Sequence, residues 1–271
     1  TDTPEQILES VKKAGIDLFA LTDHDAIKGC ICIEKIRKSE DPKFLTGVEF
    51  SCKDESGKYH ILGYGYDPDA QAIRNVVDLG HSYRITKVKA RLKLLKEQFG
   101  ITFSQEDVDA LFALDNPGKP HIGNLMTEYK YVRTKEEAIK KYINQVHFRS
   151  QYVRPEQAIT GILGAGGIPV LAHPSFGSGD QLIIGRDMDE RLQRLVSFGL
   201  QGVEAYYSGF TRELQEQMLQ YAWQYGLYVT AGSDYHGTNK PIGLGNHNCP
   251  KREEYPAGMI RFLDAIHGKI K

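Results

Sequence analysis

Histidine and carboxylate side chains recur along this chain at one kind of position, at or just beyond a short run predicted to form a strand. Six residues share that placement: His24, Glu49, His60, His173, Asp234 and His236. Strand ends on one face of a β/α barrel converge in space, so we expect these side chains to lie together. Imidazoles mixed with carboxylates suit Zn, Mn or Fe, and more than four such ligands indicate two or more ions that share a bridging carboxylate. Two neighbouring ions are suited to the hydrolysis of a phosphate ester.

Other catalytic devices are poorly represented in the sequence. It contains no G-x-S-x-G nucleophile elbow and no Walker A motif. The stretch Gly63-Tyr64-Gly65 lacks the third glycine of a dinucleotide-binding fingerprint. Metal-assisted hydrolysis is therefore the favoured chemistry.

The elements that must position these residues begin close to the first residue. Thr3 and Gln6 form a capping-box pattern around Pro4, which predicts a helix that ends at Gly15. The mostly apolar run over residues 16–21 follows and predicts a strand that leads into a polar cluster containing His24.

The same order of elements returns along the chain. Further predicted strands are residues 44–50, 168–172, 202–207 and 228–231, with helical patterns before the last three. This repetition indicates an α/β architecture with mainly parallel strands. Between residues 69 and 149 the strand signal disappears and charge-rich helical patterns replace it. We expect one barrel domain, residues 1–68 and 150–271, with a helical insert over residues 69–149.

Composition narrows the classes of partner. The 271 residues carry a net charge of −1 with the two signs well mixed, so no surface for bulk polyanion binding is indicated. The most apolar stretch, residues 158–172, is shorter than the about 18 apolar residues of a membrane span and contains Pro169. Four irregularly spaced cysteines predict free thiols in a reducing cytosol, and hence a cytoplasmic protein without membrane partners.

Five motifs resemble, in order, those of the PHP (polymerase and histidinol phosphatase) family. They are residues 20–25 (ALTDHD), 47–51 (GVEFS), 60–64 (HILGY), 172–174 (AHP) and 232–237 (GSDYHG). The match spans nearly the whole chain. The sequence is most similar to the branch that removes a phosphate from nucleoside 3',5'-bisphosphates and trims short oligonucleotides, because GKPHI at residues 118–122 falls in the helical insert as expected.

The resemblance implies a distorted seven-stranded β/α barrel that holds two or three divalent ions, of Mn, Zn or Fe. It assigns six ligands: Glu49 as the bridge, His60 and His173 to one site, Asp234 to another, and His24 and His236 to a third. Glu49, Asp234 and His236 are thereby the expected catalytic residues. The expected reaction is attack on phosphorus by a hydroxide that bridges two ions. The family pattern opens with a His-x-His strand and an aspartate, which we expect immediately before Thr1.

Residues outside these motifs are candidates for substrate contacts. Lys119 and His121 precede a helical run and can hold phosphate oxygens, with Arg154 or Arg149 as a further cation. Against this role, Lys and Arg side chains on a protein surface are usually just solvated. The expected substrate is a phosphorylated small molecule, foremost a nucleotide, with short RNA or DNA oligonucleotides as a further class.

For two further pairs of residues, the sequence is compatible with either a functional or a structural role. Asp23 and Asp25 can orient metal-binding imidazoles or can cap the loop that carries them. Tyr206 and Tyr207 can stack on a base, although aromatic residues of the core and rim with bonded hydroxyls are the favoured interpretation.

Two alternative functions stay open. One is a phosphatase for another substrate, such as histidinol phosphate, with the same site. The other is a noncatalytic binding or regulatory module, because barrels of this family also occur as polymerase domains with degenerate metal sites.

Overall fold

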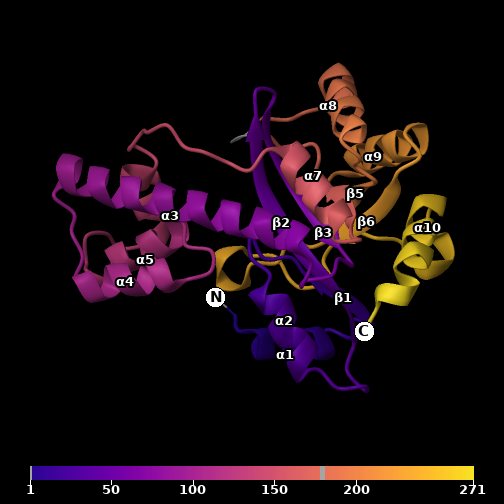
Figure 1. The fold of residues 1–271 in the computed structure, drawn as a ribbon, viewed down its shortest axis with the longest axis horizontal. Coiled ribbons are helices and arrows are strands. Elements are labelled where there is room, and N and C mark those ends of the chain that lie inside the picture. Colours follow the sequence, from indigo (N-terminus) through magenta and orange to yellow (C-terminus); the bar gives the residue numbers. More distant parts are fainter. Residues whose placement is uncertain (1, 178–180) are drawn as a thin grey trace. The chain divides into compact units, whose positions relative to one another are not determined.

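A curled six-stranded sheet carries the predicted ligands (Figure 1), and the structure, a computed structural model, describes residues 2–177 and 181–271. In spatial order the strands are β1 (Leu18–Leu21), β2 (Lys43–Asp54), β3 (Gly57–Tyr64), β4 (Ile168–Leu171), β5 (Gly202–Tyr207) and β6 (Tyr228–Gly232). The pairs β1–β2, β4–β5 and β5–β6 are parallel. Only β3 runs antiparallel to both of its neighbours among these strands. The expected α/β class is confirmed in this form, with six strands.

The β2–β3 hairpin differs from the mainly parallel sheet that the sequence predicts. Strand β2 continues to Asp54, and a two-residue turn leads straight into β3 at Gly57. Gly57 has a φ of 127°, a backbone conformation that glycine adopts readily and other residues rarely adopt. His60 therefore lies inside a strand, opposite Ser51, and not at a strand end. Because side chains alternate between the faces of a sheet, His60 and Glu49 share one face as diagonal neighbours.

Helices flank this sheet. They are α1 (Pro4–Lys13), α2 (Lys28–Ile36), α7 (Pro155–Gly164), α8 (Gly185–Ser197), α9 (Arg212–Gln224) and α10 (Ala257–Ile266), with 3₁₀ turns at Gly237–Asn239, Arg252–Glu254 and His267–Lys269. Helix α7 packs against β3 and β4, α9 against β5, and α10 against β6. The buried side chains of Leu45, Leu62, Val170, Phe262 and Ile266 form part of the core between α10 and the sheet.

The capping box of α1 is confirmed. The Thr3 side chain accepts a hydrogen bond from the Gln6 backbone N–H at 3.3 Å, and the Gln6 side chain accepts one from the Thr3 N–H at 2.8 Å. Pro4 opens the helix, and Gly15 follows it with a φ of 67°.

The structure divides into two compact units, Thr1–Val77 with Val153–Lys271, and Asp78–Tyr152. Helix α3 (Gln71–Phe99) begins in the first unit and continues in the second, which also contains α4 (Gln105–Ala113), α5 (Lys119–Glu128), α6 (Lys135–Ala138) and a π-helical turn, Ile139–Ile143. The second unit has its own core, which includes Val88, Leu95, Ile122, Met126 and Ile143.

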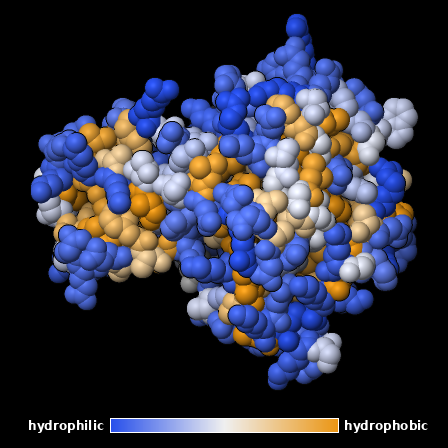
Figure 2. Space-filling model, in the orientation of Figure 1, coloured by the Kyte–Doolittle hydropathy of each residue, from blue (hydrophilic) through white to orange (hydrophobic). Residues whose placement is uncertain are grey.

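None of the helices in the described part of the chain is long and apolar enough to cross a membrane. On the face that Figure 2 shows, hydrophilic side chains surround the hydrophobic ones, which are scattered among them.

Candidate metal centre

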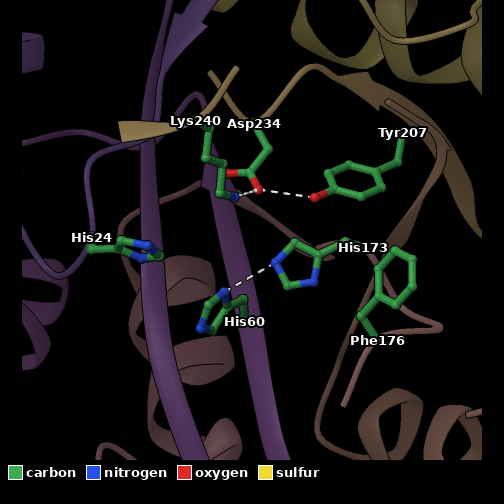
Figure 3. Close-up of a pocket in the computed structure, with 7 residues that line it drawn as sticks. All are labelled: His24, His60, His173, Phe176, Tyr207, Asp234 and Lys240. Carbon is green, nitrogen blue, oxygen red and sulfur yellow. Dashed lines mark hydrogen bonds and ion pairs between the residues drawn. The ribbon is translucent and has the colours of Figure 1, made fainter. Parts of the chain in front are cut away.

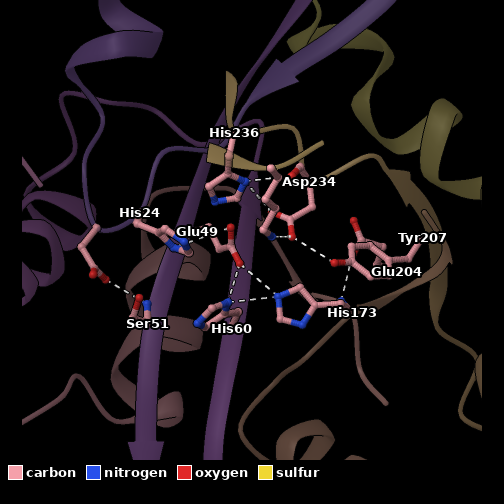
Figure 4. A network of polar contacts seen from close by, with 11 residues as sticks. His24, Glu49, Ser51, His60, His173, Glu204, Tyr207, Asp234 and His236 are labelled. Atoms are coloured by element: carbon pink, nitrogen blue, oxygen red, sulfur yellow. Dashed lines mark hydrogen bonds and ion pairs between the residues drawn. The ribbon is translucent and has the colours of Figure 1, made fainter. Parts of the chain in front are cut away.

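The carboxylate of Glu49 is buried in the sheet and faces three imidazoles (Figure 4). His60 Nδ1 lies 2.7 Å from Glu49 Oε1, and His173 Nε2 lies 3.3 Å from the same oxygen. His24 Nδ1 lies 3.7 Å from the other oxygen, Oε2. The two nitrogens near Oε1 are themselves only 3.0 Å apart. Four residues from separate segments thus direct ligand-type atoms at one point.

His24 reaches this point because the loop after β1 stays paired with β2. The Asp25 backbone N–H donates to the Glu49 carbonyl at 2.9 Å, and the Glu49 N–H donates to the Asp23 carbonyl at 3.1 Å. The buried Asp25 carboxylate accepts the Ser51 N–H at 2.9 Å, and its backbone has a φ of 52°. This bond supports the loop-capping interpretation of Asp25.

His173, just after β4, is held by a carboxylate that sequence reasoning did not single out. Its backbone N–H donates to Glu204 Oε2 at 2.8 Å, and its φ of 28° lies in the left-handed region. Glu204 is buried in β5, where a Cβ at position 232 would come within 2.1 Å of Glu204 Oε1. Gly232 therefore leaves space for the Glu204 side chain.

Asp234 and His236 complete the group. The Tyr207 hydroxyl donates to Asp234 Oδ2 at 3.0 Å, and the Lys240 ammonium forms an ion pair with the same oxygen. His236 Nδ1 lies 3.2 Å from Asp234 Oδ1, and the His236 ring is 5.7 Å from the ring of His24. Asp234 has a φ of 52°, so it shares a positive φ with Asp25 and His173. Such strained backbone gathers at functional sites.

Neighbouring charges and burial shift the pKa values of Glu49 and His173 in opposite directions. Burial alone raises the pKa of the Glu49 carboxyl, but the neighbouring His24 and His60 and the hydrogen bonds from His60 and His173 lower that pKa well below its usual value. Burial lowers the pKa of His173, but Glu49, Glu204 and Asp234 outweigh it and raise that pKa. Burial raises the pKa of Glu204 to about 7.

The donor set fits a divalent cation. In a tetrahedral site with metal–ligand distances of 2.0–2.1 Å, ligand atoms lie about 3.3 Å from one another. Glu49 Oε1, His60 Nδ1 and His173 Nε2 are separated by 2.7 to 3.3 Å. One ligand atom each from His24, Glu49 and His60 also lie within 4.8 Å of one another. Imidazole nitrogens and carboxylate oxygens are the ligands that Zn, Mn and Fe accept.

A cavity of about 220 Å³ opens beside these residues (Figure 3). Its lining includes four of the predicted ligands, His24, His60, His173 and Asp234. Phe176, Tyr207 and Lys240 also line it. Phe176 and Lys240 lie in loops, where no periodic pattern could single them out.

The predicted substrate-contact residues have hydrogen-bond partners within their own units. In the second unit, Lys119 and His121 occupy the first turn of α5, not the residues before a helix, and Lys119 Nζ donates to Asn144 Oδ1 at 2.5 Å. The Gly118 N–H donates to His121 Nδ1 at 3.2 Å, and burial lowers the pKa of His121. In the first unit, Arg154 donates to both carboxylate oxygens of Glu55 at 3.1 Å. Their roles toward substrate stay predictions.

Tyr206 and Tyr207 are 7% and 9% exposed, so neither offers an open ring face of the kind that stacks on a base. The Tyr207 hydroxyl is bonded to Asp234. The favoured interpretation, aromatic residues of the core and rim, describes both better.

No family model matches the chain. A 3',5'-nucleoside bisphosphate phosphatase of Chromobacterium violaceum is 26% identical over 94% of this chain and 87% of its own. A phosphoribosyl 1,2-cyclic phosphate 1,2-diphosphodiesterase of Eggerthella lenta is 29% identical, covering 88% of this chain and 89% of its own. A 5'-3' exoribonuclease of Haemophilus influenzae is 26% identical over 90% and 88%.

Solved structures agree with these relatives. A metal-dependent phosphoesterase from Bifidobacterium adolescentis superposes with a TM-score of 0.81 at 27% identity and covers 98% of this chain and 91% of its own. An amidohydrolase structure from Chromobacterium violaceum, with a TM-score of 0.80 at 24% identity over 99% and 92%, shares the fold. The chain is therefore homologous along nearly its whole length to phosphoester hydrolases, which confirms the predicted resemblance to PHP-type metal-dependent phosphoesterases.

Proposed function

We propose that this protein is a metal-dependent phosphoesterase that hydrolyses a phosphate monoester of a nucleotide, such as a nucleoside 3',5'-bisphosphate, and also trims short oligonucleotides. One observation carries the proposal: the buried Glu49 carboxylate faces three imidazoles whose nitrogens lie 2.7 to 3.7 Å from its oxygens. The relatives named as a bisphosphate phosphatase and an exoribonuclease support the substrate class.

The proposed cofactors are two or three divalent ions, of Mn, Zn or Fe. Glu49 is the proposed bridge, with His60 and His173 at one ion, Asp234 at a second, and His24 and His236 at a third. We also propose that the complete fold is the distorted seven-stranded barrel of the PHP type. Bound ions would supply the Lewis acidity that activates water and offsets charge on the phosphate.

The protein's own groups would position the residues that hold the ions. The Tyr207 hydroxyl donates a hydrogen bond to the Asp234 carboxylate, and the Lys240 ammonium forms an ion pair with the same oxygen. His236 Nδ1 lies 3.2 Å from the other Asp234 carboxylate oxygen and 2.8 Å from the Asp234 backbone carbonyl oxygen. We assign Asp234 and His236, with Glu49, to catalysis, because they would hold the ions that act on the phosphate.

A cyclic phosphodiester is the second candidate substrate, because the 29% identical relative is named for a 1,2-cyclic phosphate. A phosphodiesterase and a phosphomonoesterase can share the same ion chemistry. The first product would separate them, since opening a cyclic diester yields a phosphate monoester, whereas hydrolysis of a monoester releases inorganic phosphate.

The test measures hydrolysis by Mn²⁺-loaded protein of four substrates: adenosine 3',5'-bisphosphate, a short RNA, a ribose 1,2-cyclic phosphate and histidinol phosphate. We expect inorganic phosphate from the bisphosphate, and at least a 1,000-fold lower rate in Asp234→Asn. Asp187→Asn, an exposed aspartate of α8, is the matched control and should keep the wild-type rate. Absence of hydrolysis of all four substrates, or wild-type rates in Asp234→Asn, would contradict the proposal and favour a noncatalytic module.

A further inference from the structure

Besides Tyr207, whose hydroxyl donates a hydrogen bond to Asp234, two lining residues of the cavity are not among the proposed metal ligands: Phe176 and Lys240. They line the same space as His24, His60, His173 and Asp234 (Figure 3). One offers an aromatic ring and the other an ammonium. These are two chemistries that a nucleotide needs from its binding site, one for the base and one for the phosphate.

Phe176 is a partly exposed ring that its neighbours hold in place. Its exposed fraction is 37%, although it packs against Tyr207 at 5.8 Å and Phe210 at 5.5 Å between ring centroids. Tyr207 and Phe210 are buried, and the Phe176 backbone N–H donates to the His173 carbonyl at 3.0 Å. A ring fixed in this way can receive a flat group with little loss of side-chain entropy.

A glycine makes room for this aromatic cluster. A Cβ at position 209 would lie 2.8 Å from a Tyr207 ring carbon and 3.4 Å from a Phe176 ring carbon. Gly209 therefore lets Tyr207 and Phe176 pack side by side at the edge of the cavity. Figure 3 shows the two rings together on one side, with His24 on the other.

Lys240 brings a positive charge to the same space. Its ammonium is paired with Asp234, and 38% of its side chain is exposed. A cation bound by Asp234 would repel this ammonium, and the flexible lysine stem lets the ammonium turn to another anion in the cavity. A phosphate group next to the ions is such an anion.

The size of the cavity sets where each part of a ligand would lie. Its volume of about 220 Å³ is below the roughly 300 Å³ at which pockets begin to enclose whole small molecules. A phosphate with its sugar would fill the interior, and an attached base would remain at the mouth. Phe176 is the exposed aromatic residue available there among the described lining residues.

We propose that Phe176 and Lys240 are the substrate-recognition pair of this pocket, Phe176 by stacking on the base and Lys240 by binding the phosphate. The inference rests on the proposed function, because it assumes that the ligand is a nucleotide. Substrate specificity is thereby assigned to two residues that are not among the six predicted metal ligands.

The first experiment compares Phe176→Leu with wild type on adenosine 3',5'-bisphosphate and on the same ribose bisphosphate without a base. Because stacking on the aromatic ring is lost, kcat/KM for the adenosine compound should fall roughly tenfold. For the base-free compound it should stay within about twofold, because no stacking is lost. Phe176→Trp should retain the adenosine activity. Phe99→Leu, at 40% exposure in the second unit, is the matched control.

Equal losses on both compounds, or no loss on either, would overturn the role of Phe176. If wild type hydrolyses neither bisphosphate, the role of Phe176 is tested by binding instead. Calorimetry then compares the affinities of wild type and Phe176→Leu for AMP and for ribose 5-phosphate. In that event the proposed function fails, but a selective loss of AMP affinity still supports stacking, and equal AMP affinity refutes it.

The second experiment uses Lys240→Met, which keeps the apolar stem and removes the charge. The inhibition constant of inorganic phosphate and the KM of both bisphosphates should rise about tenfold. Calorimetry should show Mn²⁺ affinity that is equal to wild type or higher, because a competitor for Asp234 has been removed. Unchanged phosphate inhibition, or weakened Mn²⁺ binding, would show that Lys240 supports the structure of the site and does not recognise substrate.

Discussion

The β2–β3 hairpin carries two buried carboxylates with opposite surroundings. Glu49 faces imidazoles, with His60 and His173 nitrogens at 2.7 and 3.3 Å. Asp54, at the end of β2, has a side chain that is 0% exposed and pairs with the guanidinium of Arg194 at 2.5 Å. Both charges are compensated, but by groups of different acidity.

That difference decides what each end of the hairpin can do. A guanidinium keeps its proton at every pH near neutrality and offers no lone pair, so the Asp54 cluster can only stabilise the structure. An imidazole loses its proton close to neutral pH and then binds metals through nitrogen. A buried carboxylate among imidazoles is therefore a ligand set, whereas one beside arginine is a structural ion pair.

The largest effect is expected from Glu49→Gln. The amide cannot act as a charged bridge between cations, so Mn²⁺ affinity measured by calorimetry should fall at least about 100-fold. Glu97→Gln, an exposed glutamate of α3, is the control and should bind as wild type does. Circular dichroism should show an intact fold in both variants. If Glu49→Gln binds Mn²⁺ as tightly as wild type does, Glu49 is not a metal ligand, and its contrast with Asp54 fails.

A somewhat smaller effect is expected at Glu204, which holds His173 through its backbone. Glu204→Ala removes the acceptor at 2.8 Å from the His173 N–H and should lower Mn²⁺ affinity and kcat by about 10- to 100-fold. Glu204→Gln keeps an acceptor oxygen and should restore most of both. If the alanine and glutamine variants behave alike, the hydrogen bond does not position His173.

Arg194→Met tests the other end of the hairpin. It leaves Asp54 buried without its guanidinium, and since Arg194 is 30% exposed we expect a loss of about 2 kcal/mol of unfolding free energy. The midpoint temperature of thermal unfolding should fall by roughly 4–8 °C. Arg186→Met, which removes an exposed pair with Glu190, should change the midpoint little. Mn²⁺ affinity should not change in either variant, and a loss in Arg194→Met would mean that the two ends are coupled.

The smallest effect is expected from Arg154→Met, which removes an exposed ion pair with Glu55 that contributes little to stability. Position 55 is six residues along the hairpin from Glu49, about 20 Å at strand spacing. We expect an unchanged KM for a mononucleotide and a raised KM only for oligonucleotides long enough to reach Arg154. A raised mononucleotide KM would place Arg154 nearer the pocket than the hairpin allows.

The sequence predicts that the ligand candidates lie close together, because they follow runs of strand type. His24, His173 and Asp234 follow apolar runs, and the structure brings them into one cavity. The capping box of α1 is equally local, since Thr3 and Gln6 satisfy each other within one turn. Local signals of this kind do not depend on the rest of the fold.

The residues that sequence reasoning missed depend on contacts between distant segments. Glu204 reads as an ordinary polar residue of a strand, and only the approach of Gly232 and His173 shows why it is buried. Lys240 and Phe176 come from loops, whose conformation no periodic pattern predicts. The β2–β3 turn lacks a strong hairpin dipeptide, so the antiparallel direction of β3 was not expected.

The most direct test of the metal centre is anomalous diffraction from crystals soaked in Zn²⁺. We expect a peak about 2.0–2.3 Å from Glu49 Oε1, His60 Nδ1 and His173 Nε2, because these atoms already lie within 3.3 Å of one another. Peaks only at other positions, with Glu49 still hydrogen-bonded to His60, would contradict a metal site at these three atoms.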